Sequence, residues 1–193
     1  MEGKYWVNAF GIAIALLVYL LGSLFYAGPA QIMFLVSSFG ILALATLILV
    51  LLTPLLVRVK NVPLTRFLFT QQRWIGLYVF FFALVHVLLV YNFFFNWNFG
   101  IIFTLPNSVF LVFGLLAFLT LAVISSTSND FAIRALGSRN WKNVQRLVYL
   151  VLVLVLLHSF NVGLLVLNNQ LLQAVIVIAL LVLGALKFNV IKL

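Results

Sequence analysis

Six long apolar stretches, divided by short polar segments, constrain the fold of this 193-residue chain more than any other feature. They run over residues 5–26, 32–56, 74–95, 108–125, 147–167 and 171–187. Each is close to the ~20 residues that an α-helix needs to cross a bilayer, and lipid offers the backbone no hydrogen-bond partners outside the segment. We therefore predict an all-α membrane protein in which a bundle of six transmembrane helices forms a single domain over residues 1–193.

The composition supports a lipid environment. Hydrophobic residues make up 66% of the chain and charged residues 7%, whereas a soluble domain carries about 25% charged residues. This difference disfavours the alternative of buried helices in a soluble protein. The chain has no cysteine, which excludes disulfides, thiolate metal ligands, iron–sulfur clusters and thioether-attached haem. Any metal centre must therefore rest on the two histidines.

The basic residues predict the orientation. Eleven Lys and Arg residues give a net charge of +9, but they are spread over short segments, which favours a topology signal over nucleic-acid binding. With six spans, all eleven fall on one side of the membrane. By the positive-inside rule both termini then face the cytoplasm, or the stroma of a thylakoid. We expect a multi-pass protein of a bacterial inner membrane or a thylakoid, with anionic lipid or an acidic partner as secondary explanations for the charge.

Two histidines lie within these spans. His86 follows Arg73 by 13 residues and His158 follows Arg146 by 12, so both imidazoles lie ~18–20 Å above the basic ends of their helices. An ionisable side chain within a span is a candidate functional residue. Two imidazoles at one depth can clamp a flat cofactor, although histidines hydrogen-bonded between helices are the alternative.

Small residues leave a similar choice. Gly40, Gly76 and Gly114 can provide space for a porphyrin, or can simply allow helices to approach closely.

Several short motifs carry a family resemblance. In chain order they are L-L-T-P-L at 51–55, Q-Q-R-W-I-G-L at 71–77, His86, T-S at 127–128, L-G at 136–137, Trp141, Tyr149 and His158. With this order and spacing the chain resembles the ferric reductase-like transmembrane domain, and within it the MsrQ-type branch of haem-binding membrane subunits. The resemblance implies a cytochrome b-like protein in which His86 and His158, on the third and fifth helices, are the axial ligands of a haem b iron.

The resemblance also implies where a second, inner haem would be held. Members with two haems have an inner pair of ligands, at positions where this chain has Gln72 and Gln145. An amide is a poor ligand for haem iron, so we expect one haem. The inner site is then empty or holds a quinone or flavin near Gln72, Arg73, Gln145 and Arg146.

These observations predict a haem-binding membrane subunit that passes electrons between a quinol or a cytoplasmic flavin donor and a redox partner protein or other membrane subunits. No Walker or dinucleotide-binding motif occurs in the chain, so a redox subunit is favoured over a complete enzyme. The alternative is a non-redox structural subunit of a larger membrane complex. A transporter is less favoured because the spans contain no acidic residue.

Overall fold

The computed structural model describes residues 3–106 and 108–162, together with residues 173, 177 and 184. The elements of the first two ranges are all helical. In chain order they are α1 (Gly3–Phe25), α2 (Gly28–Val59), α3 (Pro63–Thr70), α4 (Gln72–Phe93), the 3₁₀ helix η1 (Phe99–Phe103), α5 (Ser108–Ser126), α6 (Asp130–Arg146) and α7 (Val148–Val162).

Five helical stretches in the described part of the chain are long and apolar enough to cross a membrane. They are α1, α2, α4, α5 and the combined stretch Asp130–Asn161 of α6 and α7. Their positions agree with the first five apolar stretches of the sequence. The sixth predicted span, residues 171–187, lies outside the continuously described residues, so the number of six helices stays a prediction.

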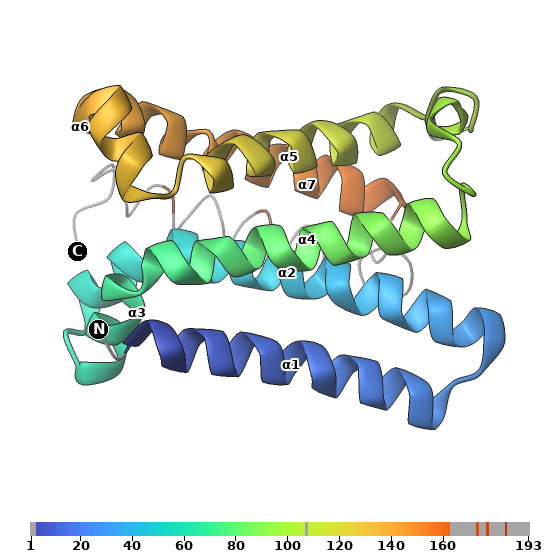
Figure 1. Cartoon of the computed structure of the whole chain (residues 1–193), viewed down its shortest axis with the longest axis horizontal. Coiled ribbons are helices and arrows are strands. Elements are labelled where there is room, and N and C mark those ends of the chain that lie inside the picture. Colours follow the sequence, from blue (N-terminus) through green and yellow to red (C-terminus); the bar gives the residue numbers. More distant parts are fainter. Residues whose placement is uncertain (1–2, 107, 163–172, 174–176, 178–183, 185–193) are drawn as a thin grey trace.

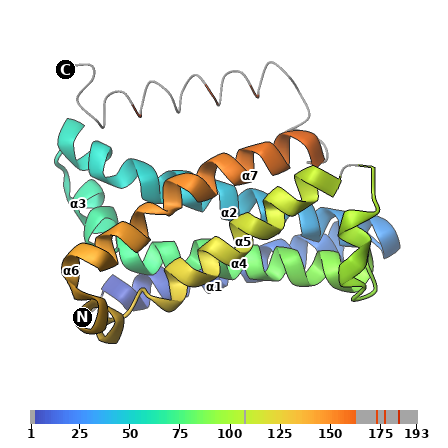
Figure 2. The same ribbon diagram turned by 90° about the horizontal axis from the view of Figure 1, so that it is seen from above.

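The long helices lie side by side along the length of the molecule (Figure 1). α2 packs mainly on α4, and α5 packs mainly on α7, while α1 packs on α2 and α4. Figure 2 shows α7 crossing over α2 and α5, and α7 contacts both of these helices. The two helix pairs α2–α4 and α5–α7 thus form the centre of the bundle, with α1 on its side.

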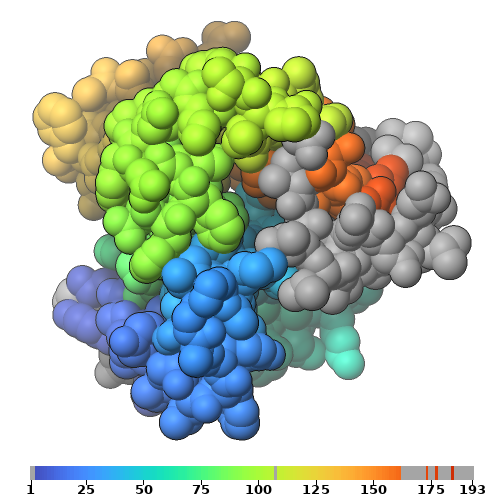
Figure 3. Space-filling model, turned by 90° about the vertical axis from the view of Figure 1, so that its right-hand side faces the viewer, coloured from blue at the N-terminus to red at the C-terminus, as the bar shows by residue number. Residues whose placement is uncertain are grey.

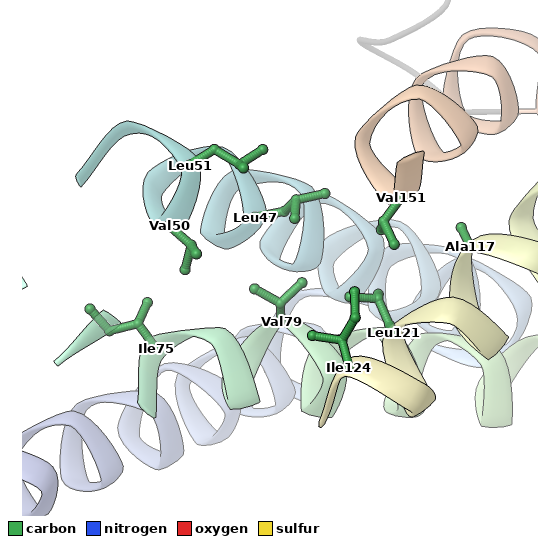
Figure 4. Packing of buried hydrophobic residues seen from close by; sticks show 9 residues of the cluster. All are labelled: Leu47, Val50, Leu51, Ile75, Val79, Ala117, Leu121, Ile124 and Val151. Atoms are coloured by element: carbon green, nitrogen blue, oxygen red, sulfur yellow. The ribbon is translucent and has the colours of Figure 1, made fainter. Parts of the chain in front are cut away.

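The central core joins these four helices. Its nine buried side chains point toward one another in Figure 4 and are Leu47, Val50, Leu51, Ile75, Val79, Ala117, Leu121, Ile124 and Val151. Leu47 is 1% exposed and Val151 is fully buried. Side chains of α2, α4, α5 and α7 therefore fix the relative positions of the helices that carry the two histidines and Gln72.

The polar segment after α5, which lies between the predicted spans 108–125 and 147–167, is helical. The Asn129 side chain caps α6 by accepting a hydrogen bond from the Ala132 backbone N–H at 2.8 Å, and Asp130 lies in the first turn, where a negative charge is favourable. Gly137 has φ 74° and divides α6 into two halves. α6 has mixed polarity, so a prediction based on apolar stretches does not detect it.

The polar segment between the predicted spans 32–56 and 74–95 also contains a helix, α3. Pro63 starts it, and the Thr65 hydroxyl accepts a hydrogen bond from the Val62 backbone N–H at 3.1 Å. Proline suits the first helical turn because its missing N–H would have no partner there.

All basic residues that the structure describes lie in segments at one end of the bundle. The start of α1, α3 and α6 meet at this end, and the α1–α2 turn and the α4–α5 connection lie at the other (Figure 1). The residues are Lys4, Arg58, Lys60, Arg66, Arg73, Arg134, Arg139, Lys142 and Arg146. We call this end the basic end.

Candidate functional site

His86 and His158 lie opposite each other between the two central helix pairs. His86 on α4 has its Nδ1 atom 2.8 Å from the carbonyl oxygen of Val36 on α2. His158 on α7 has its Nδ1 atom 3.0 Å from the carbonyl oxygen of Phe110 on α5. A carbonyl can only accept, so each Nδ1 carries the hydrogen and each Nε2 is the nitrogen left with a lone pair. Hydrogen bonding through one ring nitrogen is how metal-binding histidines are usually oriented.

The separation of the two imidazoles suits a shared metal. Their ring centroids are 6.4 Å apart and their planes are inclined at 78°. Imidazole nitrogens bind metals at about 2.0 Å, so rings at this separation are close enough to hold one metal between them. Two imidazoles supply two ligands, the number required at the axial positions of a macrocycle-bound iron.

Two of the three glycines considered above face these histidines. A Cβ atom at Gly40 would lie 3.1 Å from His86 Nδ1, and one at Gly114 would lie 2.7 Å from His158 Nδ1. Each glycine comes four residues after the carbonyl that its histidine contacts, Val36 and Phe110. Absence of a side chain at these positions lets each imidazole approach the helix and reach that carbonyl. A Cβ at Gly76 would have nothing within 4 Å.

A cavity of about 470 Å³ adjoins the two histidines. Its size falls within the ~300–1,000 Å³ of small-molecule and cofactor sites. Apolar side chains of α2, α4, α5 and α7 form most of its wall, and the α4–α5 connection contributes Ile102, Leu105 and Pro106. Figure 3 looks onto this end of the bundle, where the connection lies above the α1–α2 turn. The imidazoles thus lie in a largely apolar chamber with room beside them.

The two glutamines form a second, similar layer nearer the basic end. Gln72 on α4 donates through Nε2 to the Val50 carbonyl at 2.9 Å, and Gln145 at the end of α6 donates through Nε2 to the Ile124 carbonyl at 3.3 Å. On α2 the acceptor of Gln72 follows the acceptor of His86 by fourteen residues, and on α5 the acceptor of Gln145 follows the acceptor of His158 by the same number. The structure therefore repeats one arrangement twice, with imidazoles in one layer and amides in the other.

The carbonyl that Gln72 contacts has no backbone N–H donor within its own helix. Pro54 lies inside α2, and proline has no N–H to donate to the carbonyl four residues earlier, which is Val50. The Thr53 hydroxyl, which is fully buried, also donates to this oxygen at 2.8 Å. These two side chains replace the missing backbone bond, so the Val50 carbonyl has hydrogen-bond partners where α2 lacks its usual backbone donor.

A second cavity, of about 360 Å³, lies beside the glutamines. Gln72, Arg73 and Gln145 line it together with Trp141, and Leu121 lines both cavities. The structure thus brings together three of the four residues predicted for an inner site. Arg146, the fourth, is not among the lining residues; it is exposed, and its Nη1 is 3.2 Å from Asn143 Oδ1.

Arg73 joins α4 to the turn between α5 and α6. Its Nε donates to the Ser128 carbonyl at 2.9 Å, and its Nη1 forms an ion pair with Asp130 Oδ1 at 2.7 Å. Trp141 donates from Nε1 to the nearby Thr127 carbonyl at 2.9 Å. These bonds satisfy backbone carbonyls at the end of α5, where a cation is also favoured by the helix dipole.

The backbone acceptors of both layers were not predicted from the sequence. Val36 and Phe110 act through carbonyl oxygens, so their side chains carry no signal. The sequence signal for these two acceptors was the glycine four residues after each of them. The signal for Val50 was Pro54, four residues after it.

Comparison with known proteins places these elements in one family. The family described as "Ferric reductase like transmembrane component" matches residues 39–156, a region that includes His86 and ends two residues before His158. It therefore covers more than half of the chain, from α2 into α7.

Two relatives illustrate this similarity. The protein-methionine-sulfoxide reductase heme-binding subunit MsrQ of Polaromonas naphthalenivorans (strain CJ2) is 35% identical over 138 residues, 69% of this chain and 59% of that protein. The magnetosome protein MamZ of Magnetospirillum gryphiswaldense (strain DSM 6361 / JCM 21280 / NBRC 15271 / MSR-1) is 35% identical over 88 residues, 45% of this chain and 14% of that protein. The alignments thus span less than two thirds of either relative. No solved structure is significantly similar to the chain. From the family match, this chain is a membrane protein of the ferric reductase-like transmembrane family.

Proposed function

We propose that the chain binds one haem b between His86 and His158 and serves as an electron-transfer subunit of a membrane oxidoreductase. The observation that carries this proposal is the paired histidine geometry. Both Nδ1 atoms are oriented by carbonyls, and the ring centroids lie 6.4 Å apart beside an apolar cavity. The similarity to MsrQ, which is named as a heme-binding subunit, supports the same conclusion.

In this proposal the two imidazoles hold the iron and the surrounding helices set its environment. A haem with both axial positions filled supplies one-electron transfer rather than substrate binding at the metal. The Val36 and Phe110 carbonyls keep each Nδ1 protonated and each ring in one orientation. The mostly apolar walls from four helices would limit contact of the cofactor with water, which is a determinant of the reduction potential.

The second cavity, beside the glutamines, is the proposed entry point for electrons, and we call it the inner cavity. The glutamine layer beside it lies about 21 Å along the helices from the histidine layer, because fourteen helical residues separate the two sets of acceptors. Gln72, Arg73 and Gln145 would bind a quinol, or a flavin that receives electrons from the cytoplasm; Arg146 lies nearby without lining the cavity. Electrons would leave through a redox partner protein or other membrane subunits. We propose six spans, both termini inside, in a bacterial inner membrane or a thylakoid.

Reduced-minus-oxidised absorbance of the purified full chain tests the function. We expect the bands of a low-spin b-type haem in the wild type and their loss in His86→Ala and in His158→Ala. Asn161→Ala is the matched control, because Asn161 lies on α7 near His158 and its side chain donates to its own helix at the Leu157 carbonyl. Normal bands in either histidine variant would refute the ligand assignment. A wild type that takes up no haem would favour the non-redox structural subunit.

A further inference from the structure

The second half of α6 carries three basic side chains on one face. Arg139, Lys142 and Arg146 are separated by three and four residues, which at 3.6 residues per turn places them within a sector of about 60°. All three are exposed. Gly137 divides α6 just before them, so they belong to one uninterrupted helical segment. We call these three residues the cation stripe.

Other side chains of the same segment are directed into the bundle. Trp141 donates to the Thr127 carbonyl, and Gln145 donates to the Ile124 carbonyl and to the Thr127 hydroxyl. This half of α6 therefore has an inward face bonded to α5 and the turn after it, and a cationic face at the surface. The first half of α6 adds two exposed apolar side chains, with Phe131 73% and Leu136 38% exposed.

The chain cannot neutralise the cation stripe internally. It has eleven Lys and Arg residues and two Asp and Glu residues, so at least nine cations lack a carboxylate of their own. One of the two acids, Asp130, is paired with Arg73. The positive-inside rule explains why cations lie at this end of the bundle. It does not explain why three of them share one face of one helix.

The depth of the cation stripe indicates its partner. α6 ends at Arg146 and leads directly into α7, whose apolar stretch begins at Val148. From Arg139 to Arg146 the helix rises about 10 Å. The polar layer on each side of a bilayer, about 5–7 Å by difference between total and hydrocarbon thickness, is thinner than this. With α7 in the hydrocarbon, the cation stripe crosses the level of the lipid phosphates, where Lys and Arg can extend their charged ends.

We propose that the cation stripe binds the phosphate groups of anionic phospholipids in the leaflet at the basic end of the bundle. In this proposal the three cations, at successive depths on one face, contact the phosphates. The site lies on a different face from the inner cavity, so it does not depend on haem or on any inner cofactor.

Native mass spectrometry of the purified full chain with equal amounts of phosphatidylglycerol and phosphatidylcholine tests this proposal. We expect the wild type to retain phosphatidylglycerol preferentially. The triple variant Arg139→Gln, Lys142→Gln, Arg146→Gln should weaken its relative association by roughly fivefold per cation, on the order of a hundredfold in total at low salt. Added salt should weaken the wild-type preference. Inorganic phosphate should weaken it no more than another salt does at the same ionic strength.

The matched control removes three charges from the same end of the bundle but outside the cation stripe. The triple variant Lys60→Gln, Arg66→Gln, Arg134→Gln should keep most of the preference for phosphatidylglycerol, and both triple variants should bind phosphatidylcholine as the wild type does. Equal loss in the two triple variants would show an effect of net charge alone and overturn the proposal. So would a wild type without lipid preference, which would leave an acidic protein as the partner, or displacement of the lipid by inorganic phosphate.

Discussion

Substitution of Gly114 by alanine should weaken cofactor binding by displacing His158. The new Cβ would lie 2.7 Å from Nδ1, 2.9 Å from Cε1 and 3.0 Å from Cγ of the imidazole, whereas ordinary contact begins near 3.4 Å. The ring must therefore move by about 0.7 Å, the difference between these values at Nδ1. Since Nδ1 is already 3.0 Å from the Phe110 carbonyl, this movement lengthens the bond that orients the ring. Loss of such a bond to a metal ligand weakens metal affinity by about 10–100-fold.

A graded series of alanine variants makes this prediction quantitative. At Gly40 the Cβ would lie 3.1 Å from His86 Nδ1, so the required movement and the loss of affinity should be smaller. At Gly76 nothing lies within 4 Å, so this variant is the control for a general effect of alanine in a transmembrane helix. Haem per protein and the reduced-minus-oxidised spectrum should rank the variants as Gly76→Ala, Gly40→Ala and Gly114→Ala, from least to most affected.

The series also separates displacement from unfolding. Each variant is purified without added haem and its thermal unfolding is compared with that of the wild type under the same conditions. If Gly114→Ala binds haem with wild-type affinity, or if Gly76→Ala loses as much affinity as Gly114→Ala, the glycines do not position the imidazoles and the argument fails.

The remaining predictions concern topology, haem number and the inner layer. In intact cells, a tag at Asn61 or Ser138 should be protected from an external label and a tag at Asn98 should be labelled. The opposite pattern would show that the orientation is reversed. Haem extraction against protein mass should give one haem per chain, and two would show that the glutamine layer also serves a haem. Gln72→Leu should lower stability against unfolding by about 0.6 kcal/mol, the average for hydrogen bonds between membrane helices, and by no more than about 1.7 kcal/mol. Most of that cost should disappear in a Pro54→Ala background, where the helix N–H returns to the Val50 carbonyl, and an equal cost in both backgrounds would contradict the assigned role.

The sequence predicted the spans well because length and apolarity alone determine them. Five of the six predicted stretches correspond to helices of the described chain. α3 and α6 were missed for a shared reason: both are polar or mixed, and their helical structure depends on capping by Thr65 and Asn129. Capping is a local signal that apolar runs do not reveal. A search for a capping side chain next to each basic segment would have indicated both.

The two histidines of the candidate site could be selected from the sequence, whereas the backbone groups that they contact could not. His86 and His158 could be selected because imidazoles are rare in lipid. Val36 and Phe110 could not, because a carbonyl acceptor depends on how far one helix is shifted along another. That shift is fixed by packing of the core between α2 and α4 and between α5 and α7. Gly40 and Gly114 face the imidazoles, and whether they also leave space for a porphyrin stays a prediction.

On α2 the acceptor carbonyls of the two layers differ in whether their own helix supplies a backbone N–H donor. This difference supports a single haem. Residue 40 is a glycine with an N–H for the Val36 carbonyl, so the bond from His86 orients the ring without replacing a helix bond. Pro54 has no such N–H, and the bond from Gln72 restores what α2 lacks.

Gln145 has a related structural role at the end of α5. Its Nε2 lies 3.3 Å from both the Ile124 carbonyl and the Thr127 hydroxyl, and an amide nitrogen has two hydrogens with which to serve two acceptors. A histidine Nδ1 has one hydrogen and could serve only one of them. Amides at these positions therefore stabilise the backbone of the bundle in a way that imidazoles would not fully reproduce. The inner layer has a physical reason to contain glutamine that is independent of any cofactor.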